Sequence, residues 1–423
     1  MHMVTVIGLG FVGLTTSLGI ASLGTTVFGY DVNKQRSEKI KQCEACFGDP
    51  IIAKKLQQMI GKSFWVVENL REAVAASDCI FICVGTPSEK DGSVDLDEVV
   101  SAVNSCLEVI PHDGIHRTIV IKSTVPPGTC DSVISKLVMT AGFDPESLSI
   151  ASNPEFLREG HCWEDFMNPG RIVIGTDDVR AQESLHKIYE KIEADVFNVT
   201  PRTAEFSKYL SNVMLASMIS FSNEMAYAAE IFGNVDIRAS FEVIQRDPRI
   251  MGSGIAAYLY PGCGYGGYCL PKDTMAFNVA LKEQGYNSCL IEDVIKVNDM
   301  ATIRLCNKIT RLATPSDCIG ILGLAFKKDT VDVRNSVSEK IIRLLLDRGY
   351  SNICAFDPKA TENFKMSNQD INIDYCITAK ELICKAEVIV LVTDWDIFRE
   401  LDYSGKILVD GRYMLEQIKK GND

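Results

Sequence analysis

The chain opens with alternating apolar and polar stretches of the kind found in parallel α/β domains. An apolar run over residues 4–7 leads into a glycine-rich turn, an apolar-periodic stretch to residue 23 and a second apolar run over residues 26–31. These patterns predict a strand, a turn, a helix and a strand, which together make a βαβ unit. Two later apolar runs, over residues 79–84 and 118–122, predict further strands that end in polar loops.

A second copy of this pattern lies near the C-terminus. Apolar runs over residues 317–324, 352–357 and 386–394 repeat the strand order of the first half, with a helix predicted after Asn335. The sequence therefore predicts an internal repeat of two Rossmann-like units.

The two copies differ in the turn after the first strand. Asp357 in the second copy takes the place of Asp31, but the turn reads G-L-A-F-K-K-D-T. Lys327 and Lys328 stand where glycines would admit a diphosphate, so this turn predicts a nucleotide site of a different kind.

The segment between the copies is the most helical part of the chain. Residues 201–232 contain no internal glycine or proline, and Thr200-Pro201 and Gly233-Asn234 are start and stop signals. Such a helix would be about 45 Å long, enough to bridge two domains. Further helical sequence continues to residue 313, where Thr314-Pro315-Ser316 ends it.

The predicted fold class is therefore α/β, with two doubly wound Rossmann-like domains joined by a long helix and a helical middle domain. The expected boundaries are 1–200 for the N-terminal dinucleotide-binding domain, 201–313 for a helical and dimerising middle domain, and 314–423 for the C-terminal domain.

The first turn carries a dinucleotide fingerprint. Gly8, Gly10 and Gly13 form G-x-G-x-x-G directly after a strand, which suits a tight turn, close approach to a diphosphate and close helix packing. Asp31 ends the next strand, where its carboxylate can accept hydrogen bonds from the adenosine ribose. This arrangement favours NAD, while Arg36 nearby leaves NADP open as an alternative.

Composition and charge exclude several classes of function. The net charge of −13 argues against a general binder of nucleic acids or anionic membranes, which need a basic face. No apolar run approaches the roughly 20 residues of a membrane helix, and the first residues lack a charged leader, so we expect a cytoplasmic protein. The 15 cysteines lack the spacing of a disulfide scaffold, and Cys43 and Cys46 form an isolated C-x-x-C. We expect reduced thiols and no metal site.

A glycine-rich loop precedes a candidate nucleophile. Four glycines lie within residues 262–267, and Cys269 follows, with Lys272 and Asp273 three and four residues on. If a helix starts at Pro271, its positive end and the lysine would activate a thiolate at Cys269. An unreactive cysteine at the end of a loop remains the alternative.

Two further groups of polar residues have a catalytic and a bland interpretation. Lys208 and Asn212 share one face of the long helix, where they could stabilise an oxyanion or could be a snorkelling lysine beside a surface amide. Glu155 and Glu159 follow the predicted strand over residues 149–152, as general acid or base groups or as solvated loop charges.

Eight ordered motifs resemble those of the nucleotide-sugar dehydrogenases. The similarity runs from Val4 to about Arg412 and rests on G-L-G-F-V-G, S-T-V-P-P-G, N-P-E-F-L-R-E-G, R-I-V-I-G, A-E-F-S-K-Y-L-S-N, G-Y-G-G-Y-C-L-P-K-D-T, G-L-A-F-K-K-D-T-V-D-V-R-N-S and D-G-R.

The resemblance implies a four-electron oxidation of the 6-hydroxymethyl group of UDP-glucose to a carboxylate, with two NAD consumed and no aldehyde released. It implies that Cys269 forms a thiohemiacetal and then a thioester, and that Glu155 is the base for hydrolysis. Lys208 and Asn212 would hold the oxyanions, and Asp273 and Thr124 would order a water molecule.

The same resemblance assigns ligand contacts. For NAD they are Gly8, Gly10, Phe11, Val12, Gly13, Asp31, Arg36, Thr86, Thr124, Glu159, Lys272 and Arg334. For the nucleotide sugar they are Glu155, Phe156, Leu157, Lys208, Asn212, Arg249, Tyr265, Gly266, Phe326, Lys327 and Arg412. The Arg249 loop is usually donated across a dimer in this family, which implies a homodimer or a larger homo-oligomer.

One departure from the family bears on the sugar. The stretch between Arg249 and Cys269 looks about four residues longer than in close relatives, and it lies where the sugar is contacted. Y-C-L-P-K-D favours UDP-glucose over the UDP-hexosamines, and GDP-mannose is the other alternative. Two hypotheses of other classes remain: a regulator that binds NAD without turnover, and a two-electron hydroxyacid dehydrogenase. The hydroxyacid dehydrogenase would not need the C-terminal nucleotide unit.

Overall fold

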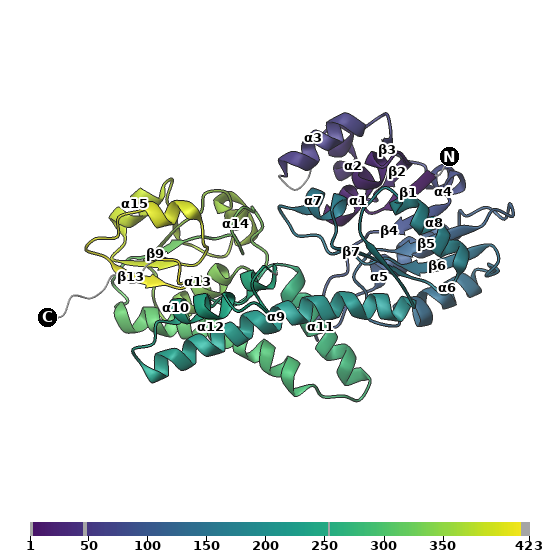
Figure 1. Cartoon of the computed structure of the whole chain (residues 1–423). Helices are drawn as coiled ribbons and strands as arrows, with labels where there is room; N and C mark the ends of the chain where they lie inside the picture. The colour runs from purple at the N-terminus through teal and green to yellow at the C-terminus, as the bar shows by residue number, and fades with distance from the viewer. Residues whose placement is uncertain (1–2, 45–48, 253, 416–423) are drawn as a thin grey trace. The chain divides into compact units, whose positions relative to one another are not determined.

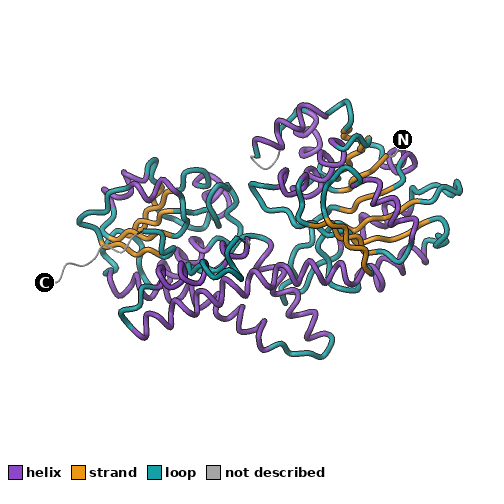
Figure 2. The backbone as a smooth tube through the Cα atoms, in the orientation of Figure 1, coloured by secondary structure: helices purple, strands orange, loops and turns teal. Residues whose placement is uncertain are grey.

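The computed structural model describes residues 3–44, 49–252 and 254–415 (Figure 1). The chain divides into two compact units, an N-terminal unit from Met1 to Leu210 and a C-terminal unit from Ser211 to Asp423. Figure 2 shows the strands gathered into two sheets, each accompanied by helices.

The N-terminal unit is built on an eight-stranded sheet in the order β3-β2-β1-β4-β5-β6-β7-β8. All neighbouring strands are parallel except β6 and β7, which are antiparallel. The strands are β1 (Met3–Ile7), β2 (Thr26–Tyr30), β3 (Phe64–Val66), β4 (Cys79–Ile82), β5 (Arg117–Ile121), β6 (Leu148–Ser152), β7 (Arg171–Gly175) and β8 (Asp195–Val199).

Helices cover both faces of this sheet because its central strands are apolar on both sides. In β4, Cys79 and Phe81 pack into one core cluster, and Ile80 and Ile82 pack into another. The helices are α1 (Phe11–Ser22), α2 (Lys34–Lys41), α3 (Pro50–Met59), α4 (Leu70–Ala76), α5 (Asp97–Leu107), α6 (Ser135–Thr140), α7 (Cys162–Met167) and α8 (Val179–Tyr189), with a π-helical turn at Cys130–Ile134.

The C-terminal unit repeats the Rossmann strand order. Its five parallel strands lie in the order β11-β10-β9-β12-β13, which matches β3-β2-β1-β4-β5. The strands are β9 (Ile319–Leu322), β10 (Ile353–Phe356), β11 (Asp374–Tyr375), β12 (Val388–Leu391) and β13 (Ile407–Asp410). The predicted internal repeat and the predicted fold class are therefore confirmed.

The segment between the two sheets is helical, as predicted. Helix α9 (Pro201–Phe232) has the bounds that the start and stop signals predicted, and Gly233 and Asn234 both have positive φ. Its residues belong in part to each unit. The other helices of the C-terminal unit are α10 (Ile237–Gln245), α11 (Cys269–Glu283), α12 (Cys289–Leu312), α13 (Val337–Asp347), α14 (Thr361–Ser367) and α15 (Ala379–Lys385), with 3-10 turns at Gly254–Tyr258 and Asp396–Glu400.

The described part of the chain has neither a membrane-spanning helix nor a cluster of metal-ligating side chains. No described helix is long and apolar enough to cross a membrane. Within residues 3–44, 49–252 and 254–415, no three His, Cys, Asp or Glu side chains could together hold a metal ion. Cys46 of the C-x-x-C pair lies outside the described residues.

Candidate active site

The glycine turn of the N-terminal unit has the geometry of a dinucleotide cradle. Gly8 has φ of +87°, so it makes the sharp turn after β1. A Cβ atom on Gly13 would lie 1.8 Å from the carbonyl oxygen of Gly8, which explains why α1 packs so closely against the turn. A Cβ on Gly10, by contrast, would meet no atom within 4 Å. The N-terminus of α1 is therefore open to a diphosphate.

Asp31 lies beside this cradle at the end of β2. Its carboxylate accepts hydrogen bonds from the backbone N–H of Leu9 at 2.7 Å and of Asn33 at 2.8 Å, and from Arg36 at 2.9 Å. These contacts fix the carboxylate where an adenosine ribose would meet it, and an acidic group there disfavours a 2′-phosphate. The residues present fit NAD, and the predicted contacts Phe11 and Val12 start α1.

Thr86 and Thr124 follow β4 and β5; β4 pairs with β1, and β5 pairs with the other side of β4 in the same parallel part of the sheet. Because parallel strands end at one edge, both threonines lie at the edge that carries the glycine turn. Glu159, also predicted to contact NAD, lies in the loop after β6.

Glu155 and Lys208 form a buried ion pair in the N-terminal unit. The Lys208 ammonium donates to Glu155 Oε1 at 3.0 Å, and the two side chains are only 7% and 9% exposed. The other oxygen of Glu155 accepts the N–H of Leu157 at 2.5 Å. The Lys208 ammonium also lies 5.5 Å from the ring centroid of Phe156. The Arg171 guanidinium lies 3.8 Å from the same centroid. The snorkelling interpretation of Lys208 is wrong, since its charge is buried against a carboxylate.

The loop after β5 is tied to α9 by a residue that the sequence analysis missed. Glu205 is buried, and its carboxylate accepts the N–H groups of Gly128 at 2.5 Å and Cys130 at 2.8 Å. It therefore anchors the loop that contains Thr124 to the helix that carries Lys208. The motif A-E-F-S-K held the only sequence signal, a glutamate one turn before the lysine.

In the C-terminal unit, Cys269 is exposed and is the first residue of α11. The helix begins two residues earlier than Pro271, so the thiol lies within the first turn, where the positive end of the helix dipole favours an anion. Other thiols differ sharply: burial raises the pKa of Cys263 to about 12.

Asp273 lies one turn after Cys269 and is fully enclosed by partners of the same unit. Asn212 donates to its Oδ2 at 2.5 Å, and Lys272 donates to its Oδ1 at 2.6 Å. Asp273 is 1% exposed, and Asn212 and Lys272 are buried as well. Lys272, predicted to contact NAD, also lies 5.7 Å from the ring centroid of Tyr268, which Arg334 approaches at 4.6 Å.

The glycine loop before Cys269 is held by buried amides that the sequence analysis did not single out. Asn298 accepts the N–H of Tyr265 at 2.6 Å and donates to its carbonyl at 3.1 Å, in the manner of a peptide group. Asn223 accepts the N–H of Gly262 at 2.7 Å. A Cβ on Gly266 would lie 2.4 Å from the Asn335 carbonyl oxygen, so the backbone of Gly266 packs directly against the turn before α13.

The predicted nucleotide residues of the C-terminal unit gather where its strands end. Phe326 and Lys327 follow β9, with the Lys327 ammonium 5.5 Å from the Phe326 ring centroid. Arg412 follows β13 and donates to Asp394 at 3.3 Å. A Cβ on Gly262 would approach the Arg412 guanidinium to 3.0 Å, which brings the glycine loop to the same place.

The carboxylate at the end of the second strand has more hydrogen-bond donors in the second Rossmann copy than in the first. Asp357 Oδ2 accepts the N–H groups of Leu324 and Ala325 and the indole N–H of Trp395, all within 3.1 Å. Its Oδ1 accepts the N–H groups of Lys359 and Ala360. Asp357 is thus the structural counterpart of Asp31, but it accepts hydrogen bonds from five protein donors, whereas Asp31 accepts from three.

Arg249 is not drawn into the groups described above. Its side chain is 87% exposed and is paired with Asp247 at 2.5 Å. The long stretch that follows is held in part by Gln245, whose amide donates to the carbonyls of Ala256 and Leu259.

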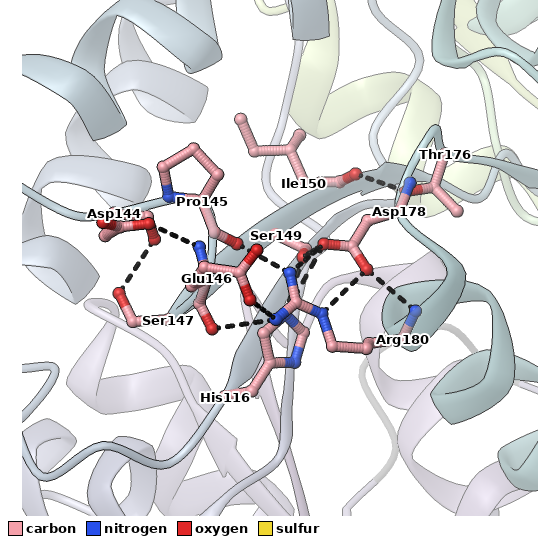
Figure 3. A network of polar contacts seen from close by, with 10 residues as sticks. All are labelled: His116, Asp144, Pro145, Glu146, Ser147, Ser149, Ile150, Thr176, Asp178 and Arg180. Carbon is pink, nitrogen blue, oxygen red and sulfur yellow. Dashed lines mark hydrogen bonds and ion pairs between the residues drawn. The ribbon is translucent and has the colours of Figure 1, made fainter.

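A serine, a histidine and an aspartate also meet at the opposite edge of the N-terminal sheet (Figure 3). Ser149 donates to Asp178 at 2.5 Å and lies 2.7 Å from His116 Nε2, while Arg180 binds Asp178 and Glu146. The serine hydroxyl is buried and bonded to the carboxylate itself. In a hydrolytic triad the histidine lies between the two, so this network is structural.

Two Rossmann units, one with an NAD cradle and an acidic strand end, and an exposed thiol at a helix start define an NAD-dependent dehydrogenase. The models of the UDP-glucose/GDP-mannose dehydrogenase family match in three parts: its NAD binding domain over residues 2–193, its central domain over 202–300 and its UDP binding domain over 320–417. The chain belongs to this family, and it is an oxidoreductase that uses NAD.

Individual relatives agree over nearly the full length. The chain is 34% identical to UDP-glucose 6-dehydrogenase AglM of Haloferax volcanii, over 96% of either protein. It is 35% identical to UDP-glucose 6-dehydrogenase of Rickettsia conorii, over 99% of this chain and 97% of the relative. A UDP-glucose dehydrogenase structure from Pyrobaculum islandicum matches with a TM-score of 0.92 at 38% identity, over 98% of this chain and 96% of that one.

Proposed function

We propose that the protein oxidises UDP-glucose to UDP-glucuronate and reduces two NAD for each sugar. The observation that carries the proposal is Cys269 at the start of α11, one turn before an Asp273 carboxylate held by Lys272 and Asn212. A thiol in this setting can keep an aldehyde as a covalent adduct until it is oxidised again. The names of the relatives from Haloferax, Rickettsia and Pyrobaculum support UDP-glucose as the sugar.

The proposed reaction has two oxidations and one hydrolysis. The C6 alcohol loses a proton and a hydride to become an aldehyde, and the Cys269 sulfur then adds to C6 to form a thiohemiacetal. Loss of a second hydride together with the hydroxyl proton of the thiohemiacetal gives a thioester, and attack by water breaks the carbon–sulfur bond and releases the carboxylate, a proton and the thiol. Bound NAD supplies the hydride acceptor in both oxidations.

The remaining roles are proposed from the charges found at each group. Lys208 and Asn212 would stabilise the oxygen anion that develops on C6, because a cation and an amide donor on one helix face suit that task. Glu155 would accept a proton from the attacking water during hydrolysis. Asp273 and Thr124 would hold that water, and Lys208 holds the Glu155 carboxylate in place through their ion pair.

The ligand assignments are proposed as follows. NAD would contact Gly8, Gly10, Phe11, Val12, Gly13, Asp31, Arg36, Thr86, Thr124, Glu159, Lys272 and Arg334. The nucleotide sugar would contact Glu155, Phe156, Leu157, Lys208, Asn212, Tyr265, Gly266, Phe326, Lys327 and Arg412.

We also propose that the active form is at least a dimer. Apolar side chains are exposed along α9 at spacings of four and seven residues, which places them in one stripe: Phe206, Leu210, Met214, Phe221, Met225 and Phe232. Residues spaced in this way suit a second copy of the same helix. Arg249, which is exposed in one chain, would then complete the site of the partner.

The test is NADH production with UDP-glucose, UDP-galactose, UDP-N-acetylglucosamine and GDP-mannose at equal concentration, with NADH counted per sugar consumed. We expect two NADH per UDP-glucose and little turnover of the others. One NADH per sugar would indicate a two-electron dehydrogenase and would contradict the thioester route. Preference for GDP-mannose would indicate that the long stretch after Arg249 determines which nucleotide sugar is accepted.

A further inference from the structure

A lysine lies buried behind the Glu155–Lys208 pair and has no part in the proposed reaction. Lys122 follows β5 and is 6% exposed. Its Nζ donates to Asn153 Oδ1 at 2.9 Å and lies 3.4 Å from the Tyr189 hydroxyl. Within the described part of the chain, no carboxylate forms an ion pair with it. A buried cation without an ionic partner is costly, so it calls for a reason.

The partner of Lys122 controls the segment that carries Glu155. Asn153 lies two residues before Glu155, directly after β6. Its Oδ1 also accepts the Tyr189 hydroxyl at 2.7 Å, its amide donates to the Val173 carbonyl at 2.7 Å, and its backbone N–H donates to Ile121 at 2.9 Å. Asn153 is therefore fixed to β5, β7 and α8 at once, and Lys122 is one of the groups that fix it.

The charges around Lys122 belong to the same pair. Burial lowers the pKa of Lys122 to about 8; the charge of Glu155 acts against this shift, and the charge of Lys208 adds to it. Cys83 after β4, Tyr189 on α8, Glu155 after β6 and Lys208 on α9 are the titratable groups that face it. With both lysines protonated, the cluster holds two cations and one carboxylate. The excess positive charge of this cluster would stabilise a developing oxyanion.

We propose that Lys122 is a positioning residue that fixes the placement of the Glu155–Lys208 pair and adds a positive charge beside it. It does not touch the reacting atoms; it acts through Asn153 and through its charge. The inference rests on the proposed function, because it assigns the pair a part in the oxidation and the hydrolysis.

Lys122→Met tests the proposal, because Met fills similar space without charge and leaves the Tyr189 hydroxyl bonded to Asn153. We expect kcat to fall by roughly ten- to a hundredfold, the scale expected when reacting groups are slightly displaced, with KM for sugar and NAD little changed. Loss of a nearby cation raises the pKa of the remaining groups, so the acid-side limb of the kcat profile should move to higher pH. Lys122→Gln, which can still donate to Asn153, should recover part of kcat and keep the displaced limb.

Tyr189→Phe is the matched control in the same network. It removes a hydroxyl from Asn153 but keeps the Lys122 charge, so a small loss of kcat with an undisplaced limb is expected. Wild-type kcat and pH profile in folded Lys122→Met or Lys122→Gln would overturn the proposal, and so would a fall in kcat without a displaced limb. Failure of the proposed function is separate, since it would show as absent turnover of UDP-glucose by the wild-type protein.

A measurement without substrate gives a second reading. The folded protein gives up the Lys122 proton at lower pH than the unfolded chain does, so folding stability from this group rises between about pH 8 and pH 10.4. The difference in melting temperature between wild type and Lys122→Met should therefore shift in favour of wild type over this range. A constant difference would contradict the buried, titrating lysine on which the proposal depends.

Discussion

Two cysteines occupy the same kind of position but differ in their neighbours. Cys269 and Cys289 are both exposed, and each is the first residue of a helix. The helix N-terminus alone would therefore activate both thiols equally. Only Cys269 has a lysine and a buried aspartate in the next turn, whereas the first turn of α12 carries the acidic Glu292.

Replacing Cys269 by Ala should remove the covalent stage and therefore carboxylate formation. We expect UDP-glucuronate production to fall by at least about a thousandfold, because losing a nucleophile costs more than losing one binding contact. Cys289→Ala is the control with the same exposure and helix position, and it should keep wild-type turnover. Steady-state NADH formation with product analysis measures both, and an active Cys269→Ala variant would contradict the thioester route.

Single residues show what sequence can and cannot reveal. Gly8, Gly13 and Asp31 were predictable because backbone sterics leave few residues for a sharp turn or a close packing contact. The inward placement of Asp357 was not, since Trp395, which takes up one of its oxygens, is distant in sequence. Lys122 had one signal, a lysine at the end of an apolar strand, but its partners Asn153 and Tyr189 meet it only in the fold.

The polar network of His116, Ser149, Asp178 and Arg180 joins elements of the N-terminal sheet at the strand ends opposite the glycine turn. His116 precedes β5, Ser149 lies on β6, and Asp178 caps α8, so three elements share one set of polar contacts. Burial, and then the charge of Arg180, lowers the pKa of His116. The folded protein therefore favours neutral histidine, and the stability it supplies is present above about pH 6.5 and is lost as the pH falls.

His116→Gln should remove this dependence while keeping a polar group beside Ser149. Wild type should be the more stable protein at pH 7.5, and its advantage in melting temperature should shrink as the pH falls to 5.5. Titration of the carboxylates elsewhere in the chain affects both proteins alike, so the difference between their melting temperatures reports on His116. An advantage that grows on acidification would mean that charged His116 stabilises the network through Asp178.

At the scale of elements, sequence prediction was strongest where local signals act alone. Helix α9 was predicted from its start and stop residues because nothing in its interior interrupts it. The start of α11 differed by two residues, because Tyr268 and Cys269 continue the helix from a glycine loop that Asn298 and Asn223 hold in place. Contacts of that kind come from distant segments and leave no local pattern.

The exposed stripe on α9 leads to a prediction for the whole molecule. Phe221→Glu places a charge in the middle of the stripe and should turn the proposed dimer into monomers, because burying an unpaired carboxylate is strongly unfavourable. Val179→Glu, at an exposed apolar residue of α8, is the control and should leave the mass unchanged. Light scattering after size-exclusion chromatography measures both. A monomeric wild-type protein would remove the basis for Arg249 acting in a partner's site.

Helix α9 carries Lys208 and Asn212 one turn apart, and each is committed to a different carboxylate: Lys208 to Glu155 and Asn212 to Asp273. The helix backbone advances by about 1.5 Å and turns by about 100° for every residue, so it fixes both the distance and the angle between these two side chains. One residue added between the two would swing one side chain away from the other's direction by more than a quarter turn. In the proposed reaction the spacing of these two residues along the helix is therefore as constrained as their chemistry, whereas an insertion in a surface loop would leave that spacing unchanged.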